Sequence, residues 1–266
     1  MAIKSTALIT GASSGIGYEL AKILANKNFD LVLVARSKDK LDKLKKEILS
    51  TIKENKVDIK IKRIVLDLAL QESPLKLFEI LKQESISITH LINNAGVGEL
   101  NRFDMTDWSK LSQMIDLNMK ALTHLSHLFL PELKTKSSAC ILNVSSIAAF
   151  LPGPNMAVYY ATKAYVQSFS EALAEELSNT NLKVISLCPG PTKSGFQEAA
   201  SISTNSPLFA GVPSSFEVAL YAVKLMESNS RVGVHGFKNK AMVFSLRFLP
   251  RRLITKVVTK IQASRT

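Results

Sequence analysis

Short apolar segments rich in β-forming residues alternate along this chain with longer segments of helical periodicity. Strands separated by helices predict a parallel sheet covered by helices on both faces. Right-handed crossovers make such a sheet doubly wound, and ligands then bind beyond the carboxyl ends of its strands. We expect strands at residues 6–10, 31–35, 59–66, 90–93, 139–144, 182–187 and 231–234, and helices at 16–27, 38–53, from Pro74 onward, at 108–133 with a late interruption at Pro131, and at 159–177.

Length and composition fit one large α/β domain. The chain has 266 residues, of which 46% are hydrophobic and 21% charged, enough for a deep core. Its two cysteines, Cys140 and Cys188, provide no disulfide framework and indicate a reducing cytosol. The apolar run at the N-terminus is too short for a signal peptide, and no uncharged apolar stretch is long enough for a membrane span. A cytoplasmic protein is expected.

A glycine-rich turn follows the first expected strand and opens the first expected helix. Residues 10–17 read Thr-Gly-Ala-Ser-Ser-Gly-Ile-Gly. Glycines let such a turn tighten and let its backbone approach a pyrophosphate, which the N-terminus of the helix attracts. The spacing G-x-x-x-G-x-G departs from the usual dinucleotide pattern G-x-G-x-x-G. The turn alone therefore indicates a nucleotide site, with a turn that binds no ligand as the alternative.

Tyr159 and Lys163 are four residues apart in an expected helix, and Ser146 lies thirteen positions before the tyrosine. Residues at i and i+4 share one helix face, so the ammonium group is expected beside the phenol. A neighbouring cation should lower the tyrosine pKa below its usual value of about 10, which makes a proton donor and acceptor useful near neutrality. The serine would hydrogen-bond the same substrate oxygen. These three residues suit carbonyl and alcohol chemistry, which also needs a hydride carrier.

Five motifs occur along the chain: Thr10 to Gly17, Asn93-Asn94-Ala95-Gly96, Ser146, Tyr159-x-x-x-Lys163 and Pro189-Gly190. Together, in their order and spacing over residues 10 to 194, they resemble the short-chain dehydrogenase/reductase family. The resemblance implies a single Rossmann-like domain with a seven-stranded parallel sheet. It also implies NAD(P)-dependent interconversion of a carbonyl and an alcohol, and assembly as a homodimer or homotetramer.

The resemblance further implies roles for individual residues. Tyr159 resembles the general acid/base, Lys163 the lysine that lowers its pKa and holds the nicotinamide ribose, and Ser146 the hydroxyl that orients the carbonyl. Asn118 resembles the asparagine of a water-linked proton relay to the lysine. Cofactor binding is also implied for Tyr159 and Lys163, for Asp67 at the adenine with Leu68 after it, and for Asn94, which braces the central sheet. The other residues implied in cofactor binding are Gly11, Ser13, Ser14, Gly15, Ile16, Gly17, Ala95, Gly96, Pro189, Gly190 and Thr192.

Several of these assignments have alternatives. Tyr160 shares a helix face with Lys163 at i+3 but is expected to pack. Ser145 and Ser146 should point to opposite faces, so only one should reach the site. Asn118 could be a solvated polar residue on a helix, and Asp67 could cap a turn. Asn93 and Asn94 could serve in a turn alone.

The cofactor preference depends on the residues that follow the second expected strand. An acidic residue there would bind the adenosine ribose and repel a 2′-phosphate. The chain instead has Ala35, Arg36, Ser37 and Lys38. The forked guanidinium of Arg36 suits a phosphate, so NADP(H) is expected over NAD(H). In the alternatives, Arg36 stacks on the adenine or is simply solvated.

Other features of the sequence are less specific. His124 and His127 have H-x-x-H spacing, but no further ligand completes a metal site, so no metal is expected. The segment 150–152 and Phe196 flank the proposed site, where they line an apolar substrate cleft or belong to the core. Residues 192–215 form the longest irregular stretch and are expected to be a substrate loop or lid.

The C-terminal end carries much of the positive charge. The net charge is +12, and residues 228–266 contain nine basic residues and no Asp or Glu. We expect residues 1–236 to form the catalytic domain and residues 237–266 a basic amphipathic extension, divided by Pro250 into two helical pieces. The extension could lie on an anionic membrane surface, or pack on the body or a partner subunit. Without a recognisable motif, nucleic acid is not expected as a partner.

These observations predict an NADPH-dependent reductase of a ketone or aldehyde, reversible as an alcohol dehydrogenase. The apolar flanks of the site and the extension favour a lipophilic substrate. Reduction of a 3-oxoacyl thioester is one alternative, and a non-catalytic protein that senses NADP(H) is another.

Overall fold

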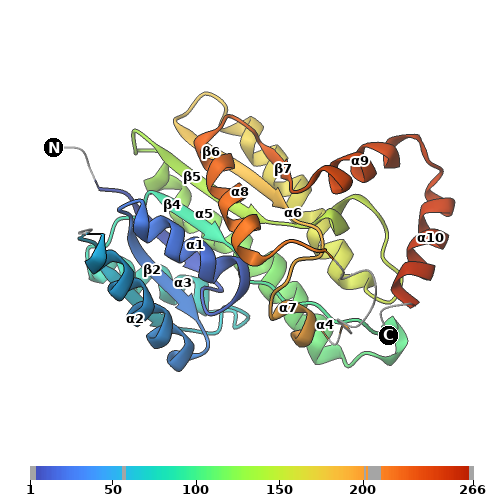
Figure 1. Cartoon of the computed structure of the whole chain (residues 1–266), viewed down its shortest axis with the longest axis horizontal. Helices are drawn as coiled ribbons and strands as arrows, with labels where there is room; N and C mark the ends of the chain where they lie inside the picture. The colour runs from blue at the N-terminus through green and yellow to red at the C-terminus, as the bar shows by residue number, and fades with distance from the viewer. Residues whose placement is uncertain (1–3, 56–57, 201, 203–210, 264–266) are drawn as a thin grey trace.

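The computed structural model describes residues 4–55, 58–200, 202 and 211–263. Its centre is a seven-stranded sheet with the order β3-β2-β1-β4-β5-β6-β7, in which every neighbouring pair is parallel (Figure 1). The doubly wound α/β fold is thereby confirmed. The strands are β1 Thr6–Thr10, β2 Asp30–Ala35, β3 Ile61–Val65, β4 His90–Asn93, β5 Ala139–Val144, β6 Leu182–Cys188 and β7 Val232–Val234.

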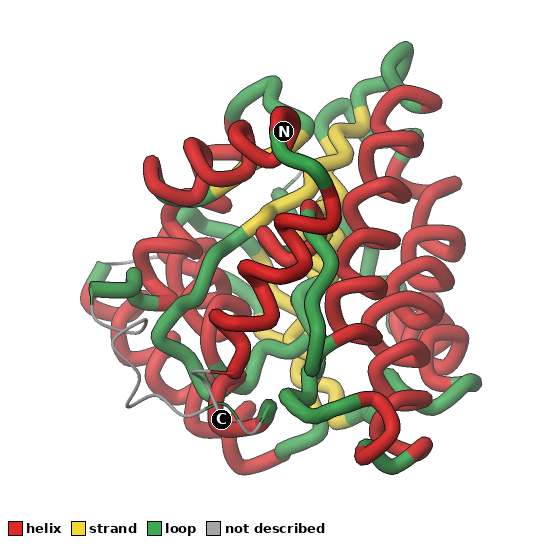
Figure 2. Tube along the Cα trace, turned by 90° about the vertical axis from the view of Figure 1, so that its right-hand side faces the viewer, coloured by secondary structure: helices red, strands yellow, loops and turns green. Residues whose placement is uncertain are grey.

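Helices cover both faces of the sheet because its strands are apolar on both sides (Figure 2). In β1, Ala7 and Ile9 pack into one core while Leu8 packs into the other. Each fully buried leucine or isoleucine contributes about 1.5–3 kcal/mol, which makes this double burial the main stabilisation of the sheet. One face carries α1 Gly15–Asn26, α2 Lys38–Glu54 and α8 Ser215–Glu227, and the other carries α3 Ser73–Gln83, α5 Leu122–Leu133 and α6 Ala157–Glu176.

The strand order reverses between β1 and β4, which are neighbours in the sheet. From this pair, the chain winds outward in one direction to β3 and in the other to β7. The connections that follow β1 and β4 run to opposite sides of the sheet, so a crevice opens beyond the carboxyl ends of these two strands. The glycine turn after β1 and residues 94–97 after β4 lie at this crevice.

The region expected to form one helix at 108–133 is divided at a different place. It comprises α4 Trp108–Ile115, a π-helical segment Asp116–Ala121 and α5 Leu122–Leu133. Pro131 lies inside α5, so the predicted interruption at Pro131 is wrong. The proline removes a single hydrogen bond in the last turn, where the helix is about to end. The break at 116–121 has no proline or glycine to signal it.

The C-terminal residues form a helical arm on the side of the molecule opposite α2 (Figure 1). The arm consists of α9 Phe237–Ser245, a 3-10 turn Leu246–Phe248 and α10 Arg251–Ala263. The division at Pro250 is as predicted. Within the expected lid, α7 Phe196–Ala199 is helical, while residues 201 and 203–210 lie outside the described residues. Over the described ranges, every helix falls short of the length and apolar content that a membrane crossing requires.

Candidate active site

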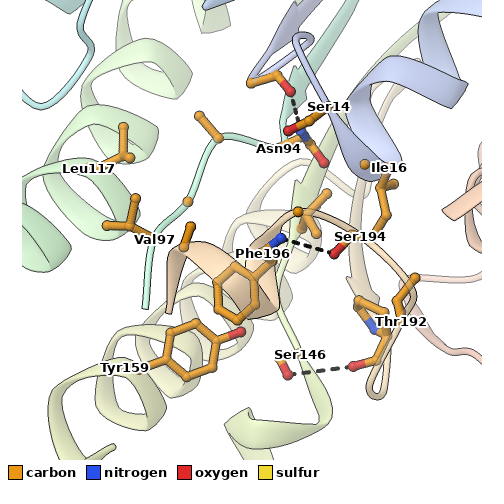
Figure 3. Close-up of a pocket in the computed structure, with 18 of the residues that line it drawn as sticks. Ser14, Ile16, Asn94, Val97, Leu117, Ser146, Tyr159, Thr192, Ser194 and Phe196 are labelled. Atoms are coloured by element: carbon orange, nitrogen blue, oxygen red, sulfur yellow. Dashed lines mark hydrogen bonds between the residues drawn. The ribbon is translucent and has the colours of Figure 1, made fainter. Parts of the chain in front are cut away.

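A cavity of about 350 Å³ lies beyond the carboxyl ends of the strands, within the range typical of ligand sites. Of the predicted site residues, only Gly17 and Asn118 are not in its wall. Figure 3 shows the side chains converging from several strand ends. The predicted residues that line the cavity are Gly11, Ser13, Ser14, Gly15, Ile16, Arg36, Asp67, Leu68, Asn94, Ala95, Gly96, Ser146, Tyr159, Lys163, Pro189, Gly190 and Thr192.

The glycine turn presents free backbone donors to the cavity. Gly11 and Gly15 have φ angles of +65° and +59°, which residues with a Cβ rarely adopt. Ser14 precedes α1 without a side-chain cap, and the first turn of the helix has no acidic residue. The N–H groups of that turn are therefore available to an anion, as a pyrophosphate cradle requires.

Asn94 joins the end of β4 to the glycine turn. Its Nδ2 donates to the carbonyls of Thr10 at 2.9 Å and Gly11 at 3.2 Å. Gly17 allows this approach, because a Cβ there would lie 2.7 Å from the carbonyl oxygen of Gly11 and closer still to Nδ2 of Asn94. Gly17 therefore acts behind the cavity wall, as a packing position. These contacts agree with the expected bracing role of Asn94.

Arg36 and Asp67 occupy the end of the cavity beyond β2 and β3. The Arg36 side chain is 61% exposed, and its Nη1 lies 3.9 Å from Oδ2 of Asp67. Oδ1 of Asp67 accepts a hydrogen bond of 3.0 Å from the Ala69 amide, so this carboxylate does cap a turn while it also lines the cavity. The Arg36 guanidinium is therefore exposed and paired with the Asp67 carboxylate at this end of the cavity.

Ser145 and Ser146 both line the cavity, so the prediction that only one would reach the site is wrong, although their hydroxyls have different partners. Ser146 begins a 3-10 turn, where its Oγ accepts from the Ala148 amide at 3.1 Å and donates to the Pro189 carbonyl at 3.5 Å (Figure 3). The Ser145 hydroxyl instead donates to the Lys163 carbonyl at 2.9 Å. Ser146 therefore lies in the same cavity wall as Tyr159, with its hydroxyl held between the Ala148 amide and the Pro189 carbonyl.

Lys163 lies beside Tyr159, but burial dominates the protonation of both. The Lys163 Nζ is 5.8 Å from the centroid of the Tyr159 ring and donates to the Val144 carbonyl at 2.8 Å. Burial lowers the pKa of Lys163 to about 8. Burial also raises the pKa of Tyr159 above that of free tyrosine, and hydrogen bonding with Ser146 offsets only part of that increase. The expectation of a lowered Tyr159 pKa is therefore wrong for the protein itself, because desolvation of the phenolate is the largest effect on that pKa.

Asn118 is buried behind the cavity wall rather than solvated. Its Oδ1 accepts from the Val97 amide at 2.9 Å, and its Nδ2 donates to the Val97 carbonyl at 2.9 Å and to Thr162 Oγ1 at 3.1 Å. A Cβ on Gly96 would lie 3.2 Å from Asn118 Oδ1 and 3.4 Å from Lys163 Nζ. Asn118, on the π-helical segment, thus fixes residues 96–97 against α6. Such bulges are frequent at functional sites.

The substrate end of the cavity includes some of the predicted residues, and a residue that was not predicted, Gln262, supports its wall. Phe196, on α7, lies 5.4 Å from the Tyr159 ring between centroids, whereas residues 150–152 do not line the cavity. Tyr160 packs, as expected, and accepts a hydrogen bond of 2.6 Å from Nε2 of Gln262 on α10. Gln262 was missed because it is about a hundred residues away in the chain. The sequence does carry one indication of it: Gln262 is an uncharged residue that continues the four-residue spacing of the apolar residues Ile254 and Val258.

Two further expectations concern polar residues outside the cavity. Asn93 is buried and donates from Nδ2 to Asn143 Oδ1 at 2.9 Å, so it ties β4 to β5 rather than serving a turn. His124 and His127 have no partners for a metal, since nowhere in the described part of the chain do three His, Cys, Asp or Glu side chains gather as ligands.

A glycine turn with free amides, at the switch point of a doubly wound sheet, is what a nucleotide-dependent oxidoreductase needs to bind its cofactor. The chain belongs to the short chain dehydrogenase family, whose model matches residues 5–204. It is an NAD(P)-dependent short-chain oxidoreductase.

Individual relatives differ in what their names say they act on. A very-long-chain 3-oxoacyl-CoA reductase of Kluyveromyces lactis is 38% identical over 185 residues, which are 67% of this chain and 52% of that protein. The match thus spans about half the length of that curated relative. A short-chain dehydrogenase from Sphingobium yanoikuyae, solved in complex with NADPH, is 30% identical with a TM-score of 0.78 over 92% of this chain and 94% of its own. The bulky-bulky ketone specific alcohol dehydrogenase from Comamonas testosteroni is 28% identical with a TM-score of 0.76 over 92% of both chains.

Proposed function

We propose that this protein is an NADPH-dependent reductase of a lipophilic ketone or aldehyde. The observation that carries the proposal is the single cavity wall that holds Ser146, Tyr159 and Lys163 together with Arg36 and the glycine turn. When bound, the nicotinamide cofactor supplies a hydride to the carbonyl carbon. The residues of the chain bind the substrate oxygen and provide its proton.

Tyr159 is the proposed proton donor. Its raised pKa keeps the phenol protonated at physiological pH, so it is ready to donate as the substrate oxygen becomes negative. The Ser146 hydroxyl, held by the Ala148 amide, would donate a second hydrogen bond to that oxygen. Lys163, anchored on the Val144 carbonyl, would replace the proton that Tyr159 gives up.

Arg36 supports the preference for NADPH. It lines the cavity where the adenosine ribose of a dinucleotide bound at the switch point would lie, and its side chain is largely exposed. A planar guanidinium can bind a 2′-phosphate with two hydrogen bonds, each charge-assisted. The Sphingobium relative was solved with NADPH, which agrees with this preference.

Apolar residues support a lipophilic substrate. Met156, Ile202 and Phe196 stand with Tyr159 and Tyr160 in the same part of the cavity wall and form a small core with them. The Comamonas relative, by its name, is specific for bulky ketones. An apolar wall of this kind favours a carbonyl that carries hydrocarbon on at least one side.

Initial rates with NADPH and NADH on a panel of carbonyl compounds test the proposal. The variant Arg36→Asp should lose about 10- to 150-fold in kcat/KM for NADPH, since a hydrogen bond to a charged group contributes about 1.5–3 kcal/mol. Lys38→Asp is the matched control, because Lys38 is exposed and does not line the cavity. Equal efficiency of the wild type with NADH would reject the preference.

Tyr159→Phe separates catalysis from sensing. It should reduce turnover by about 100- to 10,000-fold, as expected for loss of a general acid, and leave NADPH binding measured by fluorescence unchanged. A variant that keeps full turnover would contradict the assigned role. A wild type that binds NADPH but reduces no carbonyl on the panel would favour the sensing protein.

The similarity to the very-long-chain 3-oxoacyl-CoA reductase favours 3-oxoacyl thioester reduction as a second candidate. A 3-oxoacyl thioester and a methyl ketone of the same acyl length distinguish the two. A much higher kcat/KM for the thioester would assign the protein to thioester reduction.

A further inference from the structure

The helical arm exposes an unusual number of large apolar side chains. Phe237 is 86% exposed and Phe248 is 73% exposed. Phe244 contacts Phe248 edge to face, with 5.4 Å between ring centroids, and the two rings remain open to solvent. We call the following exposed residues the arm surface: Phe237, Phe244, Phe248, Leu253, Val257 and Ile261.

The apolar stripe of α10 is wider than the body of the protein covers. Residues four apart on one side of the helix are buried, and the residue immediately before each of them is exposed. Neighbouring positions are rotated by about 100° around a helix, so the buried and exposed series lie side by side. The buried series is Ile254, Val258 and Gln262, and the exposed series is Leu253, Val257 and Ile261. Leu253 and Val257 therefore leave part of the apolar stripe exposed beside its buried part.

The charged side chains of the arm itself are all positive. Lys256 and Lys260 are exposed on α10 and lie next to Val257 and Ile261, and Arg247 stacks its guanidinium 5.9 Å from the centroid of the Phe244 ring. The sequence from 228 to 266 contains no acidic residue to neutralise them. Long cationic side chains can keep their charged ends in a polar layer while the apolar residues between them enter a less polar one.

The combination of apolar and cationic groups selects among possible partners. A second copy of the chain, docked symmetrically on the same surface, would bring the two sets of cations together without an acidic residue from either arm. Binding to nucleic acid would leave the phenylalanines and leucines without an apolar partner. An anionic lipid surface satisfies both groups at once, with headgroup phosphates for the cations and acyl chains for the apolar residues.

We propose that the arm surface docks this enzyme on anionic lipid bilayers. Phe237, Phe248 and Leu253 insert at the boundary between headgroups and acyl chains, and Lys256 and Lys260 contact the phosphates. The proposal adds an interaction surface to the enzyme and does not depend on its substrate.

The same helix also forms part of the wall behind the cavity. Gln262 is fully buried, and its Nε2 donates to Tyr160 Oη at 2.6 Å and lies 3.6 Å from the sulfur of Met156. Tyr160 and Met156 both line the cavity. If the substrate is lipophilic, which rests on the proposed function, docking brings the substrate end of the cavity close to the phase in which that substrate dissolves.

Flotation of the full chain with vesicles tests the docking directly. The vesicles contain either phosphatidylcholine alone or equal parts of phosphatidylcholine and phosphatidylglycerol. The wild type should float with the anionic vesicles and stay behind with the neutral ones. Lys256→Gln/Lys260→Gln should lower partitioning by about 30-fold, since each basic residue near an anionic surface contributes about 1 kcal/mol. Phe248→Ser/Leu253→Ser should also lower it.

Matched controls lie on the other side of the molecule. Lys43→Gln/Lys46→Gln removes two exposed lysines of α2, which Figure 1 shows opposite the arm. Leu70→Ser removes another exposed apolar residue. Both controls should float like the wild type. All variants should reduce a small water-soluble carbonyl without vesicles at the wild-type rate, which separates docking from folding and from the proposed function.

Several results would overturn the proposal. They are a wild type that remains unbound with anionic vesicles, equal flotation with neutral vesicles, and equal loss in the arm variants and the α2 controls. A dimer that dissociates in Phe248→Ser/Leu253→Ser would assign the surface to a second copy. If the wild type floats but reduces no carbonyl, the docking stands and the proposed function fails.

Discussion

Burial of Lys163 should make the stability of the protein depend on pH in a predictable direction. Its pKa falls from the usual 10.5 to about 8 in the folded protein. Between these values the unfolded chain holds a proton that the folded protein has released, so the free energy of unfolding rises as the pH increases. At 1.36 kcal/mol per pKa unit, the gain from Lys163 is about 2 kcal/mol between about pH 7 and about pH 9.5.

The measurement is urea unfolding of the wild type and Lys163→Met, without nucleotide, across that pH range. The comparison is needed because burial raises the pKa of Cys140 to about 12 and of Cys188 to about 11, which lowers stability as the pH rises past 9. These effects are common to both proteins and largely cancel in the difference. The variant also leaves the Val144 carbonyl without its lysine donor, but that cost does not vary with pH.

The difference in unfolding free energy should therefore change by about 2 kcal/mol in favour of the wild type as the pH rises. Parallel curves for the two proteins would refute the reasoning, because they would mean that Lys163 keeps its usual pKa. A change of the opposite sign would mean that Tyr159 is ionised in the folded protein and holds the lysine in its charged form.

Three further predictions follow from contacts around the cavity. Gly17→Ala should lower the free energy of unfolding by about 1–3 kcal/mol, because the new Cβ would clash with the Asn94 amide and the Gly11 carbonyl. Gly195→Ala, with nothing within 4 Å of its Cβ, should change it by less than about 0.5 kcal/mol in the same urea titration. Ser146→Ala should lower kcat by about 100-fold in steady-state assays, through loss of a donor to the substrate oxygen. Gln262→Leu should change KM for a bulky ketone severalfold and leave kcat for a small one unchanged, since it alters the wall and not the reacting groups.

Most of the fold could be predicted because its signals are local, although the expected helices do not include α8 Ser215–Glu227. Each strand of a sheet buried on both faces is a continuous apolar run, and each intervening helix has its own apolar stripe. The strand and helix boundaries differ from those expected by one or two residues in most elements, as helix ends fray. The π-helical segment at Asp116–Ala121 could not be predicted, because it depends on Asn118 reaching the backbone of Val97 in another element.

The site could be predicted where a motif fixes residues relative to one another. The four-residue spacing of Tyr159 and Lys163 brings the two together on α6, and the glycine turn is fixed by its own backbone angles. The contribution of Gln262 could not be found this way, since α10 reaches the cavity through tertiary packing alone. The pKa of Tyr159 was predicted in the wrong direction because the sequence shows the charge of a neighbour but not the loss of water around both groups.

Burial of both groups changes how Tyr159 and Lys163 act together. A lysine whose pKa is about 8 is a stronger acid than a buried phenol whose pKa lies above that of free tyrosine. In the proposed mechanism, a phenolate formed at Tyr159 would be the stronger base of the two groups, so a proton supplied by Lys163 would favour the tyrosine. The same burial that prevents the tyrosine from ionising at rest makes its reprotonation favourable after it has donated. On this argument Lys163 favours reduction by restoring the acid, and the preference weakens as the pH rises above 8 and the lysine itself loses its proton.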